Sequence, residues 1–282
     1  MTEPSAQPAS PRRNWALIAL ILALLAVVVI AAITRPRAKP PGTSPAPTAG
    51  PTEETKMELP TCTVLRTPEP IRVDGVLDEA VWRRIKPVGA FMLHDGSAAP
   101  DFETEAKLCW DDTYLYVAFT CVDNDIWGTY TKRDEPLYDE EVVEIFLNPT
   151  GDLVNYFELE VSPHNVIWDG KIHNPDDTPK TMTGEPEWDC AGLLTGVRVV
   201  GTLDDRTDLD QLWSVEMAIP FAGIGREPPA DGQEWRGNLY RIDRGEKDEY
   251  SCWSPPQAPG EQPAFHIPSR FGRFIFSAQE AK

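Results

Sequence analysis

Residues 137–147, LYDEEVVEIFL, place three consecutive carboxylates directly before a run of alternating side chains. The run has the period-two pattern of a β-strand, in which successive side chains point to opposite faces of a sheet. The two faces carry alternating positions: Val143, Ile145 and Leu147 on one, and Val142, Glu144 and Phe146 on the other. A carboxylate in mid-strand between apolar neighbours is poorly explained as a solvated edge. We therefore predict that this stretch forms the floor and rim of a binding site, with Glu144 as a site residue.

Short alternating segments recur along the chain after residue 60. A tight DDT turn joins residues 104–110 and 114–121 into a hairpin, and NYFELEV at 155–161 alternates in the same way. Further strands are expected at 165–172, 193–203, 211–219, 235–242 and 271–276. Short helical turns near 78–86 and 220–224 interrupt them. Many short strands separated by turn residues predict an all-β fold, namely an antiparallel β-sandwich.

The first sixty residues are organised differently. Residues 15–33 are apolar throughout and long enough, as a helix, to cross the roughly 30 Å hydrocarbon layer of a bilayer. Residues 1–14 form a tail before this run. The run itself predicts a transmembrane signal anchor, with a cleaved signal sequence as the alternative. Residues 34–60, rich in Pro, Thr, Ala and Gly, predict a linker. The sandwich domain at 61–282 is then expected outside the cytoplasm, in a bacterial periplasm or at the cell surface.

The chain carries a formal net charge of -19 at pH 7. Nucleic-acid binding needs a cationic surface that replaces phosphate counterions, so this charge does not fit a nucleic-acid partner. Anionic polymers are disfavoured for the same reason. An acidic surface suits neutral sugars or divalent cations, and it also serves solubility alone.

Sequence motifs of the common enzyme classes are absent: there is no Walker loop, GxGxxG, HExxH, GxSxG or EF-hand string. The four histidines are scattered without metal-ligand spacing. The five cysteines contain no C-x-x-C pair. If the domain is exported, one or two disulfides fit, with an odd thiol left over and a connectivity that the sequence does not determine.

The carboxylates on the predicted strands carry more information. If residues 141–147 pair with 155–161 across a short turn, Glu144 lies near Glu158 or Glu160 on the same face. Like charges opposed across a strand pair repel, so water, a bound cation or ligand hydroxyls must compensate. Calcium takes several oxygen ligands and suits the loop acids Asp123, Asp125, Asp139 and Glu140. A glycosidase would also use two carboxylates at a defined separation, but the acids are too numerous to single out such a pair.

Five segments in collinear order resemble the family 9 carbohydrate-binding modules and their bacterial relatives. They are VDGVLDEAVW (73–82), WDDTYLYVAF (110–119), EEVVEIFLNP (140–149), WSVEMAIPF (213–221) and SRFGRFIF (269–276). The resemblance covers about residues 64–277. It implies a β-sandwich that binds the ends of sugar chains, often with structural calcium, as an accessory to carbohydrate degradation rather than as an enzyme.

In that family a sugar is clamped between two aromatic rings, while a strand glutamate and polar neighbours bind its hydroxyls. The resemblance places the rings at Tyr138 and Phe265, where the family has tryptophans, and the acceptor at Glu144. On the following strand, where the family has a basic residue, this chain has Glu158 and Glu160. The predicted ligand-binding residues are Tyr138, Glu144, Phe265, Trp127, Glu158 and Glu160. Trp168 and Trp253 also offer flat faces that could replace these rings. A position in the core is the alternative for each tryptophan, and it is favoured for Trp253.

The resulting prediction is a non-catalytic module that binds neutral polysaccharide or oligosaccharide. One alternative is a haem-binding domain of the related DOMON type, with axial ligands drawn from Met92 with His94 or from Met182 with His173. Neither pair has a spacing that favours haem. The other alternative is a structural or partner-docking module, accessory to a glycoside hydrolase.

Overall fold

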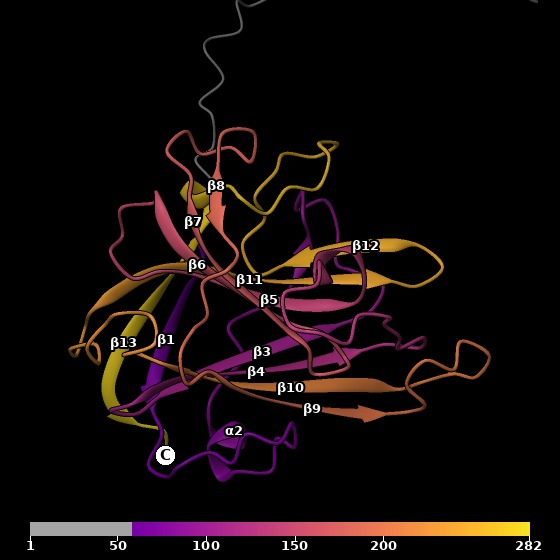
Figure 1. Ribbon diagram of the computed structural model, residues 1–282. Coiled ribbons are helices and arrows are strands. Elements are labelled where there is room, and N and C mark those ends of the chain that lie inside the picture. Colours follow the sequence, from indigo (N-terminus) through magenta and orange to yellow (C-terminus); the bar gives the residue numbers. More distant parts are fainter. Residues whose placement is uncertain (1–57) are drawn as a thin grey trace, which may run out of the picture. The chain divides into compact units, whose positions relative to one another are not determined.

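The computed structural model describes residues 58–282 (Figure 1). The predicted tail at 1–14, the predicted anchor at 15–33 and the linker up to residue 57 lie outside the described residues. Within 58–282, no helix has the length and apolar character needed to cross a bilayer.

The described residues form an all-β domain with three short helical segments, as the sequence pattern predicts. The strands are β1 (Thr61–Arg66), β2 (Met92–Leu93), β3 (Thr104–Trp110), β4 (Tyr114–Val122), β5 (Val142–Asn148), β6 (Asn155–Val161), β7 (Ile167–His173), β8 (Thr183–Glu185), β9 (Leu194–Val200), β10 (Leu212–Pro220), β11 (Glu234–Arg244), β12 (Asp248–Cys252) and β13 (Gly272–Glu280). The helical segments are α2 (Ala80–Arg84), η1 (Leu137–Asp139) and η2 (Pro268–Arg270). The alternation pattern does not predict the short strands β2 and β8, nor β12.

The strands pair in the order β8-β7-β6-β5-β11-β13-β1-β3-β4-β10-β9, while β12 adds to β11 and β2 adds to β12. Figure 1 shows two layers, with β5 to β8, β11 and β12 in one and β3, β4, β9 and β10 in the other. Strands β1 and β13 run at the side where the layers join. The sandwich is not wholly antiparallel, which corrects the prediction, because β1 pairs in parallel with β13 and β3. Strands β1 and β13 come from opposite ends of the described chain, so no tight turn between them imposes an antiparallel direction.

The alternation of β5 separates two apolar regions. Val143, Ile145 and Leu147 pack in the core between the two layers. Val142 and Phe146 belong to a second cluster, which covers the outer face of the same layer. Glu144 therefore projects from the outer face among buried side chains, as the sequence pattern predicts.

The segment that contains α2 covers the outer face of the other layer. Trp82 packs there with residues of β3, β4 and β10. The buried carboxylate of Glu216 on β10 holds this segment. It accepts hydrogen bonds from the backbone N–H groups of Asp74 and Gly75 at 3.0 and 2.9 Å, and from the Trp82 indole N–H at 2.8 Å. This carboxylate is buried with a full set of donors.

All five cysteines lie within the described residues, and all five are buried and free. None of the disulfides that an exported domain would allow is formed. Cys109 pairs with Tyr116 across the β3–β4 hairpin, as the tight turn predicts, and this register separates it from Cys121.

The two layers join where β11 passes from β5 to β13. Gly237 pairs with Leu147 of β5 and with Gly272 of β13. A Cβ at position 237 would lie 2.5 Å from the carbonyl oxygen of Phe146 and 2.5 Å from the ring of Phe274. The junction therefore needs a residue without a side chain.

We expect Gly237→Ala to destabilise the domain by about 1–3 kcal/mol, because a Cβ there overpacks against backbone and a buried ring. The unfolding midpoint should fall by roughly 2–4 °C per kcal/mol in thermal denaturation. Gly245→Ala is the control, since its Cβ would meet only the Asp243 side chain at 3.4 Å. Equal midpoints for the two variants would show that the junction tolerates a side chain.

Candidate functional site

A cavity of about 750 Å³ opens on the outer face of the layer that contains β5 and β6. We call it the main cavity. Residues from these strands, from β7 and from the segments around β12 line it: Tyr138, Glu144, Glu158, Trp168, Tyr250 and Phe265. Glu144 and Glu158 lie on its floor because their strand neighbours Ile145 and Leu159 face the core between the layers.

Four of the predicted ligand-binding residues meet in the main cavity, namely Tyr138, Glu144, Glu158 and Phe265. Tyr138 belongs to η1 and is 47% exposed, so its ring is open to a ligand. Phe265 is only 7% exposed, and its ring stacks on Tyr240 with centroids 4.2 Å apart and an interplanar angle of 16°. Tyr138 is thus an open platform, whereas Phe265 forms part of a wall.

The predicted residues Glu160 and Trp127 do not line the main cavity. Glu160 is directly opposite Glu144 in the β5–β6 pair and is fully buried beneath the floor. The indole N–H of Trp127 donates to the Arg244 carbonyl at 3.0 Å, and the guanidinium of Arg206 lies 4.5 Å from the Trp127 ring. Both contacts hold the Trp127 ring in place within the protein.

The two other tryptophans with flat faces differ in position. Trp168 on β7 is partly exposed and lines the main cavity. Trp253 is buried, stacks on Phe274 with centroids 5.2 Å apart, and donates its indole N–H to the Val88 carbonyl at 3.0 Å. Trp253 is therefore a core residue.

The sequence pattern did not point to Arg244, which organises the rim of the main cavity. Its guanidinium donates to the Tyr138 carbonyl at 3.0 Å and to the Tyr250 hydroxyl at 2.6 Å. It also pairs with Asp248 at 2.7 Å. These contacts tie β11 and β12 to the turn that presents the Tyr138 ring. Only the register of β11 brings Arg244 here, so composition and spacing carry no signal for it.

His266 is a second residue of the main cavity that the sequence pattern does not mark. Its Nδ1 lies 2.8 Å from the Tyr156 hydroxyl, and its Nε2 lies 3.9 Å from a Glu158 oxygen. Burial lowers the pKa of His266 to about 4. The imidazole is therefore neutral near pH 7 and does not offset the charge of Glu158.

The floor of the main cavity rests on three glutamates, Glu144, Glu158 and Glu160, which we call the glutamate cluster. Each offers a carboxylate oxygen within 4.8 Å of the others. Burial raises the pKa of Glu158 to about 8. Burial, with the neighbouring carboxylates, raises the pKa of Glu144 and Glu160 well above the ordinary value. The cluster therefore disfavours three full charges in the absence of a compensating group.

The four loop acids predicted to bind calcium have separate partners. Asp123 and Asp125 each pair with an arginine, at 2.8 and 2.6 Å. Glu140 accepts a hydrogen bond from the Thr129 backbone N–H at 2.6 Å, and Asp139 lines the main cavity. Carboxylates neutralised by arginine do not fit a calcium site. Calcium at these acids stays a prediction that the contacts do not favour.

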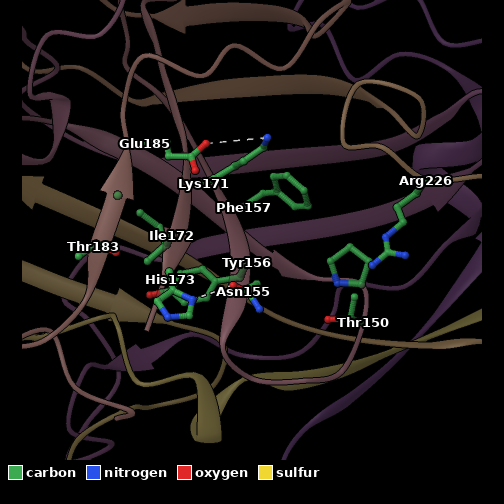
Figure 2. A pocket seen from close by; sticks show the side chains of 12 residues that line it. Thr150, Asn155, Tyr156, Phe157, Lys171, Ile172, His173, Thr183, Glu185 and Arg226 are labelled. Carbon is green, nitrogen blue, oxygen red and sulfur yellow. Dashed lines mark hydrogen bonds and ion pairs between the residues drawn. The ribbon is translucent and has the colours of Figure 1, made fainter. Parts of the chain in front are cut away.

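A smaller cavity of about 220 Å³ lies along β6, β7 and β8 (Figure 2). His173 lines it, with Nδ1 2.9 Å from the Asn155 side-chain oxygen, whereas Met182 lines the main cavity. Figure 2 also shows Lys171 reaching across to Glu185, at 4.0 Å. One of the two residue pairs considered for haem is thus divided between two cavities.

The chain is similar to known protein families and to individual known proteins. The model described as "Carbohydrate family 9 binding domain-like" matches residues 73–278. An extracellular protein of Arthroderma benhamiae is 27% identical over 186 residues, which are 62% of this chain and 78% of that protein. Exoglucanase XynX of Acetivibrio thermocellus is 28% identical over 102 residues, which are 35% of this chain and 8% of the enzyme. The similarity to the enzyme is thus confined to a small part of its length.

Solved structures share the fold. A protein of Bacteroides uniformis, described only as a candidate carbohydrate-binding protein, is 16% identical, covers 78% of this chain and 100% of its own, and has a TM-score of 0.54. A family 9 module of Caldicellulosiruptor kristjanssonii in complex with glucose is 18% identical, covers 79% of this chain and 98% of its own, and has a TM-score of 0.52. The structure of a family 9 module from the same organism in complex with cellotriose is 17% identical, covers 77% of this chain and 95% of its own, and has a TM-score of 0.51. At these identities the likeness establishes the β-sandwich fold.

The raised pKa of Glu158 should make stability depend on pH. Between the ordinary value of 4.5 and about 8, the folded state holds a proton that the unfolded state has released, so stability falls as pH rises. Glu158→Gln removes this titration. In chelator, we expect the wild type to lose at least about 1.4 kcal/mol relative to Glu158→Gln between pH 5 and pH 8, the equivalent of one pKa unit.

Urea unfolding of both proteins across this range measures the difference. His266, with a pKa of about 4, stays largely neutral across this range. Loss of the Glu158 charge also lowers the pKa of Glu144, which changes the difference in the same direction. A wild-type-to-variant difference that stays constant with pH is inconsistent with a raised pKa at Glu158.

Proposed function

The chain belongs to the carbohydrate family 9 binding domain-like family, and on that premise we propose that its sandwich is a non-catalytic carbohydrate-binding module. The observation that carries this proposal is the main cavity, which gathers the exposed ring of Tyr138 with the carboxylates of Glu144 and Glu158. The glucose and cellotriose complexes of the Caldicellulosiruptor module support a neutral glucan as the class of ligand.

A sugar ring has apolar C–H faces and a rim of hydroxyl groups, and the main cavity offers a partner for each. The Tyr138 ring packs against a C–H face, while Glu144 and Glu158 accept hydrogen bonds from hydroxyls. The rim residue Arg244 fixes the Tyr138 turn. The volume of about 750 Å³ is in the range of small-molecule sites and suits one or two sugar rings, so the module binds a chain end or a short oligosaccharide.

The second aromatic face in this proposal is Trp168 rather than Phe265. The Phe265 ring is nearly buried and covered on one face by Tyr240, so it offers a ligand little area. Trp168 lines the same cavity, is partly exposed and has the larger ring. Phe265 then acts as a wall that supports the shape of the cavity.

Binding without hydrolysis follows from the placement of the acids. A retaining glycosidase holds two carboxyl groups about 5–5.5 Å apart on either side of the scissile bond. Here the glutamate cluster projects from one face of two neighbouring strands, and Glu160 is fully buried beneath the floor. This arrangement differs from a pair of carboxylates that flanks a bond, and we therefore propose binding rather than hydrolysis.

We also propose that residues 15–33 anchor the module in a membrane and hold it outside the cytoplasm. The uninterrupted apolar run and the Pro-rich segment that follows it support this placement. Recovery of the expressed protein in the membrane fraction, and accessibility of the domain to protease in spheroplasts, would test it. Release of the full-length chain into the soluble fraction would contradict it.

Calorimetric titration with cello-oligosaccharides and xylo-oligosaccharides tests the binding function. We expect Tyr138→Ala to weaken binding about tenfold, equivalent to about 1.4 kcal/mol, because it removes the exposed platform. Leu209→Ala is the control, since Leu209 is 79% exposed and does not line the main cavity. Failure of the wild type to bind any member of a broad panel of glucans and xylans would refute the proposed function.

A further inference from the structure

Two buried carboxylates elsewhere in the domain, Glu216 and Asp169, have several donors each. Glu216 accepts three hydrogen bonds from N–H groups, as described above. Asp169 pairs with Arg133 and also accepts from the Cys190 backbone N–H. These contacts show how the fold satisfies a carboxylate when its only role is structural.

The glutamate cluster does not follow this pattern. Glu160 is fully buried, and neither of its oxygens has a hydrogen-bond partner of good geometry within residues 58–282. Glu144 is 2% exposed, and its Oε1 likewise lacks a partner. No lysine or arginine of the described chain pairs with any member of the cluster. The nearest basic group is His266, 3.9 Å from Glu158.

We propose that Glu144, Glu158 and Glu160 bind a hard divalent cation of the calcium class at the floor of the main cavity. Their oxygens lie within 4.8 Å of one another, a separation that matches ligands at about 2.3–2.6 Å around one ion. A cation there supplies the charge that the buried carboxylates lack. This site differs from the loop acids at which calcium is expected from the sequence.

The position of the cluster leaves the ion accessible. Glu144 and Glu158 line the main cavity, while Glu160 lies below them. Calcium takes about six to eight oxygen ligands, more than three carboxylates supply as single ligands. The remaining positions face the cavity, where water or two neighbouring sugar hydroxyls fill them. The ion site stands by itself, whereas its contact with sugar rests on the proposed function.

Terbium luminescence of the full-length chain without sugar tests the ion site. Tyr138 and Trp168 line the same cavity and sensitise a lanthanide bound on its floor. We expect sensitised emission that saturates at one equivalent and is displaced by calcium. Glu160→Gln should weaken binding at least tenfold. Asp134→Asn is the matched control, because it alters the other acidic group, Asp134, Asp169 and Asp189, whose carboxylates contact Arg133. Equal emission from wild type and Glu160→Gln, or none from the wild type, overturns the proposal.

Thermal unfolding gives a second readout that also shows whether the variant folds. In chelator, Glu160→Gln should unfold at or above the wild-type temperature, because it removes a buried carboxylate that lacks partners. In excess calcium, the wild type should gain several degrees and the variant should not. An equal calcium shift in both proteins overturns the ion site. Loss of sugar binding with intact terbium binding would count against the proposed function alone.

Discussion

Three carboxylates buried side by side on β5 and β6 are the constraint on which this domain depends. Carboxylates removed from water lose hydration and repel one another, so they need protons, a cation or hydroxyl donors. The surrounding sheet tolerates them because its inner face is continuous apolar core. Its outer face is also largely apolar, and there Glu144 and Glu158 line the main cavity while Glu160 is buried beneath its floor. A cation or a ligand that enters the main cavity is therefore in a position to compensate these carboxylates.

The contrast with Glu216 supports our proposal that the cluster is a binding site rather than part of the scaffold. Glu216 is just as buried, but three N–H groups satisfy it and lock the α2 segment to the sheet. Neither oxygen of Glu160 has a hydrogen-bond partner of good geometry within residues 58–282. Where the family resemblance places a basic residue on the strand after Glu144, this chain has Glu158 and Glu160. A basic residue there would neutralise the neighbouring carboxylates. With acids at these positions, a cation, a proton or a ligand must compensate the charge.

The sequence predicts the features that depend on local periodicity. A one-residue slip of β5 would place Glu144 in the core, so the alternation alone determines its face. The short turn between β5 and β6 then determines that Glu160 lies opposite Glu144. The long segment that follows β12 has no such periodicity. Whether Phe265 is open or covered depends on its stacking against Tyr240, and the position of His266 depends on the same packing. The sequence pattern does not predict the parallel pairing of β1 with β13 either, because this pairing joins distant parts of the chain.

The most direct test of this account is a crystal structure of the protein grown with a cello-oligosaccharide and calcium, with the ion located by its anomalous scattering. The account predicts a sugar ring against Tyr138, with hydroxyls directed to the floor of the main cavity, and an anomalous peak among Glu144, Glu158 and Glu160. An ordered sugar bound elsewhere on the sandwich, with only water in the main cavity, would contradict it.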